Sequence, residues 1–188
     1  TAGGFARLTL SRKFLLIFAA LGLVGLGNWL VVESTLSHLK GATTQVNIVG
    51  SIRWIGQRVQ ADTLRMAYGR GERTAVEAQL DRLDEVIHIL AYGGEHLGLA
   101  VREPSEIVRA SIEPLRLAAQ DYRTDVARAL DRLATRRSIA DELDALLVDG
   151  NYLLSTADGI AAALSVQIAE IEKQATRNLY LLALLDLA

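Results

Sequence analysis

The sequence predicts an all-α protein, an antiparallel up-down four-helix bundle between two transmembrane helices. Three observations support this fold class. The 188 residues are 51% hydrophobic but only 5% aromatic and include two prolines, a composition that favours long helices over sheet. Apolar residues recur at spacings of three and four along four separate stretches. Finally, apolar runs without Lys or Arg lie near both ends of the chain.

The first predicted membrane span covers residues 14–32, which read FLLIFAALGLVGLGNWLVV and include no charged residue. At about 1.5 Å per residue, this run is long enough to cross the hydrocarbon core. Arg7, Arg12 and Lys13 precede it and Glu33 follows it, which predicts a cytoplasmic tail at 1–13. A signal peptide is the alternative, but the run exceeds a typical h-region and no A-x-A cleavage site follows.

A second span is expected to begin at residues 178–188, which read NLYLLALLDLA. A helix needs about 20 residues to cross a bilayer, so we interpret this run as the truncated start of that span. Asp186 is unfavourable within it. The helical domain between the spans then covers residues 33–177. With a cytoplasmic tail at 1–13, we expect this domain on the opposite side of the membrane.

Four amphipathic helices are predicted between the spans. The first continues from the span to about Tyr68 and the second ends at Gly93-Gly94. After a loop, Pro104 is expected at the first position of the third helix, which Pro114 kinks or restarts. The fourth is expected to open at Ser138 with a capping box, and no convincing strand is found. The apolar stripes that define the four helices are Ile48, Ile52, Ile55, Val59 and Met66; Val76, Leu80, Leu83, Ile87 and Leu90; Leu115, Ala119, Tyr122, Val126, Leu130 and Leu133; and Ile139, Leu143, Leu146, Leu153, Ala157, Ile160, Leu164 and Ile171.

Composition argues against several function classes. The chain has no cysteine and a net charge of −2, which excludes thiolate chemistry and gives no electrostatic indication of nucleic-acid binding. His38, His88 and His96 lack the i, i+4 spacing of helical metal ligands. No catalytic constellation or phosphate loop is recognisable. We therefore expect no enzyme activity in these residues, no metal and no cofactor.

The segment from Asn47 to Arg58 reads NIVGSIRWIGQR and places Arg53 among small residues on a predicted helix. A guanidinium is a planar, permanently charged fork suited to a small anion. Val49, Arg53, Gly56 and Gln60 share one helical face. If that face met the same helix of a two-fold partner, two copies of Arg53 would repel each other, and an anion between them would relieve the repulsion.

This segment resembles the signature of bacterial nitrate/nitrite sensors of the NarX/NarQ type and of the wider PilJ-type N-terminal sensor family, in which N-x-x-G-x-x-R-M-x-x-x-R recurs. Asn47, Gly50, Arg53 and Arg58 match this pattern, whereas Trp54 replaces Met. The resemblance implies a homodimer that binds nitrate or nitrite between two first helices. It assigns the anion to Arg53, with Gly50 near it. The resulting site prediction consists of Arg53, Gly50, Asn47, Ser51 and Trp54.

The resemblance implies that residues 33–177 are a periplasmic sensor domain anchored in the inner membrane of a bacterium. Such a domain would signal through its membrane helices to a histidine kinase, a nucleotide cyclase or a chemotaxis module outside these residues. Two alternatives remain open: a four-helix sensor for another ligand or a partner protein, and a ligand-free membrane-anchored scaffold. Arg53 could instead pair with a carboxylate on another helix, and Gly50 and Gly56 could simply allow close helix packing. Arg58 and Arg65 are expected to be solvated or salt-bridged.

Overall fold

The computed structural model describes residues 9–135 and 138–186. Residues 1–8 of the predicted tail and 187–188 of the predicted second span lie outside the described residues. The chain divides into two compact units. One comprises Gly41–Ile168, and the other is formed by the described parts of 1–40 and 169–188.

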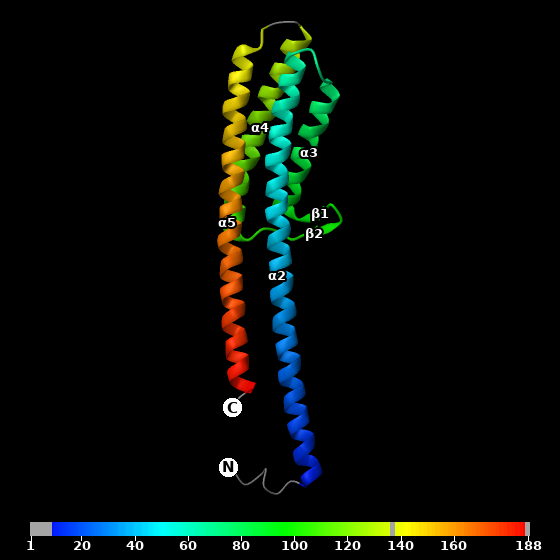
Figure 1. The fold of residues 1–188 in the computed structure, drawn as a ribbon, viewed down its shortest axis with the longest axis vertical. Coiled ribbons are helices and arrows are strands. Elements are labelled where there is room, and N and C mark those ends of the chain that lie inside the picture. Colours follow the sequence, from blue (N-terminus) through cyan, green and yellow to red (C-terminus); the bar gives the residue numbers. More distant parts are fainter. Residues whose placement is uncertain (1–8, 136–137, 187–188) are drawn as a thin grey trace. The chain divides into compact units, whose positions relative to one another are not determined.

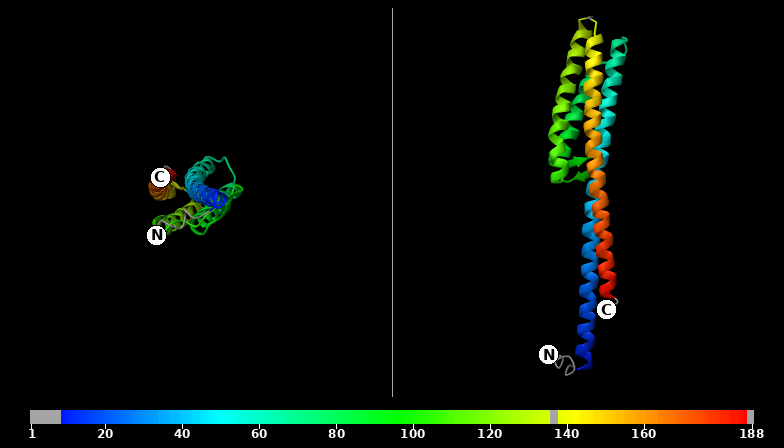
Figure 2. Two further views of the ribbon diagram at one scale, coloured as in Figure 1. Left: turned by 90° about the horizontal axis from the view of Figure 1, so that it is seen from below. Right: turned by 90° about the vertical axis from the view of Figure 1, so that its left-hand side faces the viewer.

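Within Gly41–Ile168, four helices form an up-down bundle, which confirms the predicted fold class (Figure 1). Successive helices run in opposite directions, as Figure 1 and the second view of Figure 2 show. The helices are α2 (Leu10–Ala67), α3 (Arg73–Tyr92), α4 (Glu106–Ala134) and α5 (Ala140–Asp186), with strands β1 (Gly94–His96) and β2 (Leu99–Val101) between α3 and α4.

The predicted apolar stripes form the core of the bundle. Each helix contributes side chains that are at most 1% exposed, among them Ile52, Leu83, Leu115 and Leu153. The stripe positions at the ends of the helices, such as Met66, are only partly buried. A spacing of three and four residues therefore identified the inner face of all four helices correctly.

The prediction that the chain has no strand is wrong. β1 and β2 pair antiparallel with His96 opposite Leu99, joined by Leu97 and Gly98, whose φ angles are 52° and 76°. Two positive φ angles in a two-residue loop are typical of a type I′ hairpin turn. Leu97 takes a position that Asn or Asp usually occupies, so the sequence lacked the usual hairpin signal.

Two predicted helix starts are also corrected. α4 begins at Glu106 with Ser105 as its N-cap, so Pro104 precedes the helix instead of opening it. The Ser105 hydroxyl donates to Gln167 Oε1 at 2.8 Å and makes no cap hydrogen bond. α4 then continues through Pro114 without the predicted restart. α5 begins at Ala140 rather than directly after Ser138.

A polar layer joins α2, α4 and α5 in the middle of the bundle. The Tyr122 hydroxyl, on α4, donates to the Gly56 carbonyl of α2 at 2.8 Å, and burial raises the pKa of Tyr122. A Cβ at Gly150 of α5 would lie 1.9 Å from Nε2 of Gln60, and one at Gly56 would lie 3.5 Å from Leu153. Gly150 therefore leaves room for the Gln60 side chain of α2, whereas a Cβ at Gly56 would make an ordinary van der Waals contact with Leu153.

In the other unit, α2 and α5 carry the apolar runs identified from sequence. The most apolar 18-residue window of α2 has a mean hydropathy of 2.3 and is 0% buried. The most apolar window of α5 has a mean hydropathy of 1.3 and is 22% buried, so it includes core positions of the bundle and does not coincide with the run at 178–188. Both helices are long and apolar enough to cross a membrane.

The close packing at Gly150 predicts opposite effects for two glycines of α5. Gly159 has nothing within 4 Å of an added Cβ, so Gly159→Ala should stabilise the chain by about 0.5–1 kcal/mol through helix propensity. Gly150→Val should destabilise it by about 1–3 kcal/mol, because an added Cβ lies 3.2 Å from the ring of Tyr122, which its hydrogen bond to Gly56 holds in place. Urea unfolding of the detergent-solubilised chain, followed by circular dichroism, measures both. Equal effects of the two substitutions would contradict this packing.

A second prediction concerns the buried Tyr122 hydroxyl. Tyr122→Phe keeps the ring and removes the bond to the Gly56 carbonyl, which should cost about 1 kcal/mol in the same unfolding measurement. Tyr152→Phe is the matched control, because Tyr152 is 58% exposed and should change stability by less than about 0.5 kcal/mol. A larger loss for Tyr152→Phe than for Tyr122→Phe would refute the assignment.

Candidate functional site

All five residues of the predicted site lie on α2 within Gly41–Ile168, before the polar layer. Asn47, Gly50 and Arg53 are exposed, Trp54 is 54% exposed, and Ser51 is half-buried. The Ser51 hydroxyl donates to the carbonyl of Asn47 at 3.1 Å, one turn earlier in the same helix. The helix therefore brings the five residues together on one accessible side of α2, without help from another element.

On the face that carries Val49, Arg53, Gly56 and Gln60, only Arg53 is exposed, and Gln60 is half-buried. Val49 is 0% exposed, and Gly56 lies against Leu153 and Leu154 of α5. The part of this face around Val49 and Gly56, which was interpreted as a contact with a partner copy, is thus packed within the same chain. The accessible surface of α2 is instead centred on Gly50, where an added Cβ would meet nothing within 4 Å.

Arg53 forms an ion pair with Asp158 of α5, with Nε 3.1 Å from Oδ1. The side chains are 49% and 54% exposed, so water screens the pair and it contributes at most about 1 kcal/mol. The alternative that Arg53 pairs with a carboxylate on another helix therefore holds in the single chain. α2 and α5 are antiparallel and touch at Gly56 and Leu153. Arg53 precedes Gly56 on α2 and Asp158 follows Leu153 on α5, so the two side chains come together.

Sequence reasoning missed Asp158. The residue directly follows Ala157, which belongs to the apolar stripe of α5, and so borders the buried face. An acidic residue at such a border is a natural partner for an arginine at the border of the neighbouring helix. Pairing them required the register between α2 and α5, which sequence periodicity alone does not provide.

The other arginines of this part of α2 are salt-bridged, as expected. Asp62 accepts hydrogen bonds from Arg58 Nε at 2.8 Å and from Arg65 Nη1 at 2.9 Å. Both arginines are therefore engaged within their own helix. In the described part of the chain, no group of three or more His, Cys, Asp or Glu side chains could hold a metal ion.

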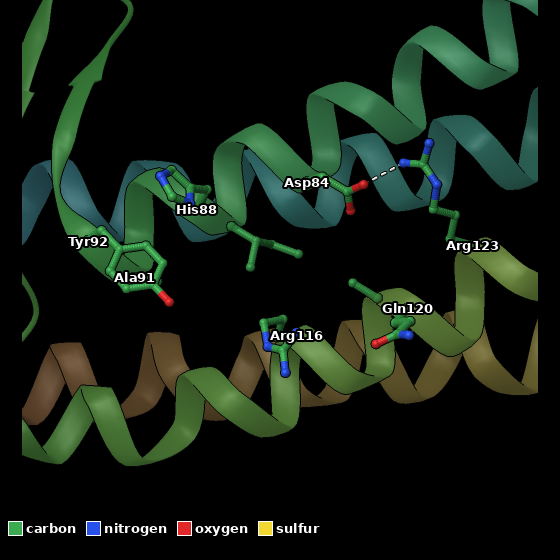
Figure 3. A pocket seen from close by; sticks show the side chains of 9 residues that line it. Asp84, His88, Ala91, Tyr92, Arg116, Gln120 and Arg123 are labelled. Carbon is green, nitrogen blue, oxygen red and sulfur yellow. Dashed lines mark hydrogen bonds and ion pairs between the residues drawn. The ribbon is translucent and has the colours of Figure 1, made fainter.

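A hollow separate from the α2 surface lies between α3 and α4, with a volume of about 310 Å³ (Figure 3). Its lining residues are Asp84, Ile87, His88, Ala91, Tyr92, Arg116, Ala119, Gln120 and Arg123. None of them was singled out as a binding residue from sequence, because the polar ones are ordinary exposed positions of amphipathic helices. The hollow appears only once the facing helices are placed.

Comparisons with known proteins bear on the fold and on the family of this domain. A search of curated proteins found no match. Among solved structures, the ligand-binding domain of the P. aeruginosa nitrate receptor McpN is similar, with a TM-score of 0.54 and 16% sequence identity. The similarity covers 65% of this chain and 94% of that domain, and at this identity it supports the helical fold alone.

The family comparison covers more than half of the chain. Residues 34–146 match the PilJ family, described as the N-terminal domain of type IV pili methyl-accepting chemotaxis transducers. This range includes the predicted site on α2 and all of α3 and α4. The chain therefore belongs to the PilJ family and carries the sensory domain of a chemotaxis transducer.

Proposed function

We propose that this domain is the input of a bacterial transmembrane receptor that binds nitrate or nitrite at a homodimer interface containing Arg53. The observation that carries the proposal is the open surface around Gly50, where the arginine fork, a polar side chain and the exposed Trp54 lie together on one helix. A second copy of α2 can approach Gly50 closely because it has no side chain. The similar McpN domain belongs to a nitrate receptor, which supports this choice of anion.

The ion pair with Asp158 defines the proposed ligand-free state of the site. In that state, the Asp158 carboxylate compensates the positive charge of Arg53 in its own chain. In the dimer, a bound anion would accept hydrogen bonds from two copies of Arg53 and compete with both aspartates. Since the exposed pair contributes little, exchanging it for the anion costs little. Ligand binding would thereby change how α2 is held against α5.

The proposed signal follows α2. This helix is continuous from Leu10 to Ala67 and includes both the apolar run at 14–32 and Arg53. Anion binding must favour one of two positions of α2 over the other, and a difference of about 1–3 kcal/mol is enough for a receptor. The output would be a chemotaxis module or another signalling module, such as a histidine kinase or a cyclase.

The proposed placement follows the sequence interpretation. Residues 14–32 would be the first membrane span, 33–177 the periplasmic domain, and 178–188 the start of a second span in the inner membrane. The tail at 1–13 would be cytoplasmic. The exposed apolar run of α2 supports the first span, and the basic residues before it support a cytoplasmic tail.

Nitrate should raise the midpoint of thermal unfolding of the full chain in lipid nanodiscs, while chloride at equal ionic strength should not. At a hundred times the Kd, ligand binding stabilises the native state by about 2.7 kcal/mol. Arg53→Ala should abolish the shift. Asp158→Asn should enlarge it at a fixed nitrate concentration, because the competing carboxylate is gone. Calorimetric scans with nitrate, nitrite and chloride make this measurement.

Arg58→Ala is the matched control for the anion titration. Arg58 is an exposed arginine of the same helix, but Asp62 engages it, so its loss should leave the nitrate shift unchanged. An equal loss of the shift in Arg58→Ala and Arg53→Ala would indicate a diffuse electrostatic effect. Absence of any nitrate effect on a demonstrated dimer would reject the nitrate proposal.

A cysteine cross-link tests the dimer surface separately. The chain has no cysteine, and Gly50 has room for a side chain, so Gly50→Cys introduces a single accessible thiol. Oxidation in the membrane should yield a disulfide-linked dimer, because the proposal places the two copies of this position next to the two-fold axis. Ala110→Cys, at an exposed position of α4, should remain monomeric on a non-reducing gel. The reverse pattern would place the interface on α4.

A further inference from the structure

The hollow between α3 and α4 combines an apolar floor with a polar rim. Ile87 and Ala119 are at most 4% exposed, and Ala91 lies beside them. Figure 3 shows Tyr92 of α3 on one side of this floor, with its hydroxyl directed toward α4, and Arg116 and Gln120 of α4 on the facing side. A concave apolar surface with a few convergent polar groups is the usual form of a small-molecule site.

The charged groups of the rim are already partly paired. Arg123 donates to Asp81 at 2.7 Å and to Asp84, the pair drawn in Figure 3. Arg116 donates from Nε and Nη2 to the two oxygens of Glu113 at 3.0 and 2.7 Å, which lowers the pKa of the Glu113 carboxyl. Asp81 and Asp84 thus pair with Arg123 across the space between α3 and α4, whereas Glu113 pairs with Arg116 within α4.

The remaining hydrogen-bonding groups include one charged donor and two groups that can donate. Among the described residues, Nη1 of Arg116, the side-chain amide of Gln120 and the hydroxyl of Tyr92 have no hydrogen-bond partner. His88 contacts the ring of Tyr92, with centroids 4.8 Å apart, and adds a ring nitrogen at the rim. A ligand that satisfies these groups needs acceptor oxygens at one end, whereas the floor of the hollow requires an apolar body.

We propose that the α3–α4 hollow is a second ligand site, independent of Arg53, for a small monocarboxylate with an apolar or aromatic body. The carboxylate would accept hydrogen bonds from Arg116 Nη1, with Gln120 and Tyr92 at its edges. The body would cover Ile87, Ala91 and Ala119. A bare inorganic anion would leave this floor uncovered, so the two sites differ in ligand class.

The test uses 4-fluorobenzoate as the probe and the full chain in lipid nanodiscs, with ¹⁹F line broadening as the readout and empty nanodiscs as the blank. The wild-type chain should broaden the line in a saturable manner. Arg116→Gln should weaken binding by about ten- to a hundredfold, because a charge-assisted hydrogen bond is lost. Ala91→Leu should block binding by filling the hollow. Glu113→Gln should tighten binding, because it removes the negative charge that partly neutralises the Arg116 guanidinium.

Arg109→Gln is the matched control. Arg109 lies two helical turns before Arg116 on the same face of α4 and pairs with Glu103, but it does not line this hollow. At about 10 Å from Arg116 along the helix, its loss should change the affinity by less than about twofold. Arg53→Ala should also leave fluorobenzoate binding unchanged, which separates this site from the nitrate proposal.

Three results would overturn the second site. The first is no saturable broadening with the wild-type chain. The second is unchanged binding in both Arg116→Gln and Ala91→Leu. The third is an equal loss in Arg109→Gln and Arg116→Gln, which would mean that the probe responds to general positive charge. The exposed Glu113→Gln variant keeps the proposal testable if a substitution in the hollow prevents folding.

Discussion

The hydrogen bond from Tyr122 to the Gly56 carbonyl is the constraint on which the geometry of this domain depends. It joins α4 to the middle of α2 within the core, near the level where Gly150 of α5 accommodates the Gln60 side chain of α2. The apolar stripe of α2 determines which face of the helix is buried, and this contact fixes where α4 meets that face. The accessible face that remains is the one that carries Gly50 and Trp54.

Arg53 stands at the border between these two faces, about one turn before Gly56, and this position explains its pairing with Asp158. A fully buried ion pair would hold α2 and α5 together too strongly for a small anion to intervene. An exposed pair contributes little and exchanges partners readily. In the proposed sensing mechanism, this weak ion pair lies beside a well-packed core. Ligand binding can therefore break the ion pair without disrupting the core.

The sequence predicted the helices and the core well, because the apolar spacing of each stripe depends only on local periodicity. It failed at the hairpin, where Leu97 adopts a positive φ that its residue type gave no reason to expect. It also failed at Asp158, since the partner of Arg53 depends on the register between two helices far apart in the chain. The site residues on α2 were recognisable as a motif, whereas the α3–α4 hollow arises from facing side chains that have no sequence signature.

The stoichiometry of nitrate binding tests the central claim most directly. Isothermal titration calorimetry of the full chain in nanodiscs measures it without reference to any variant. If two copies of Arg53 share one anion, the titration ends at one nitrate for every two chains. One nitrate for each chain would contradict the shared site and would assign the anion to Arg53 or another group within a single bundle.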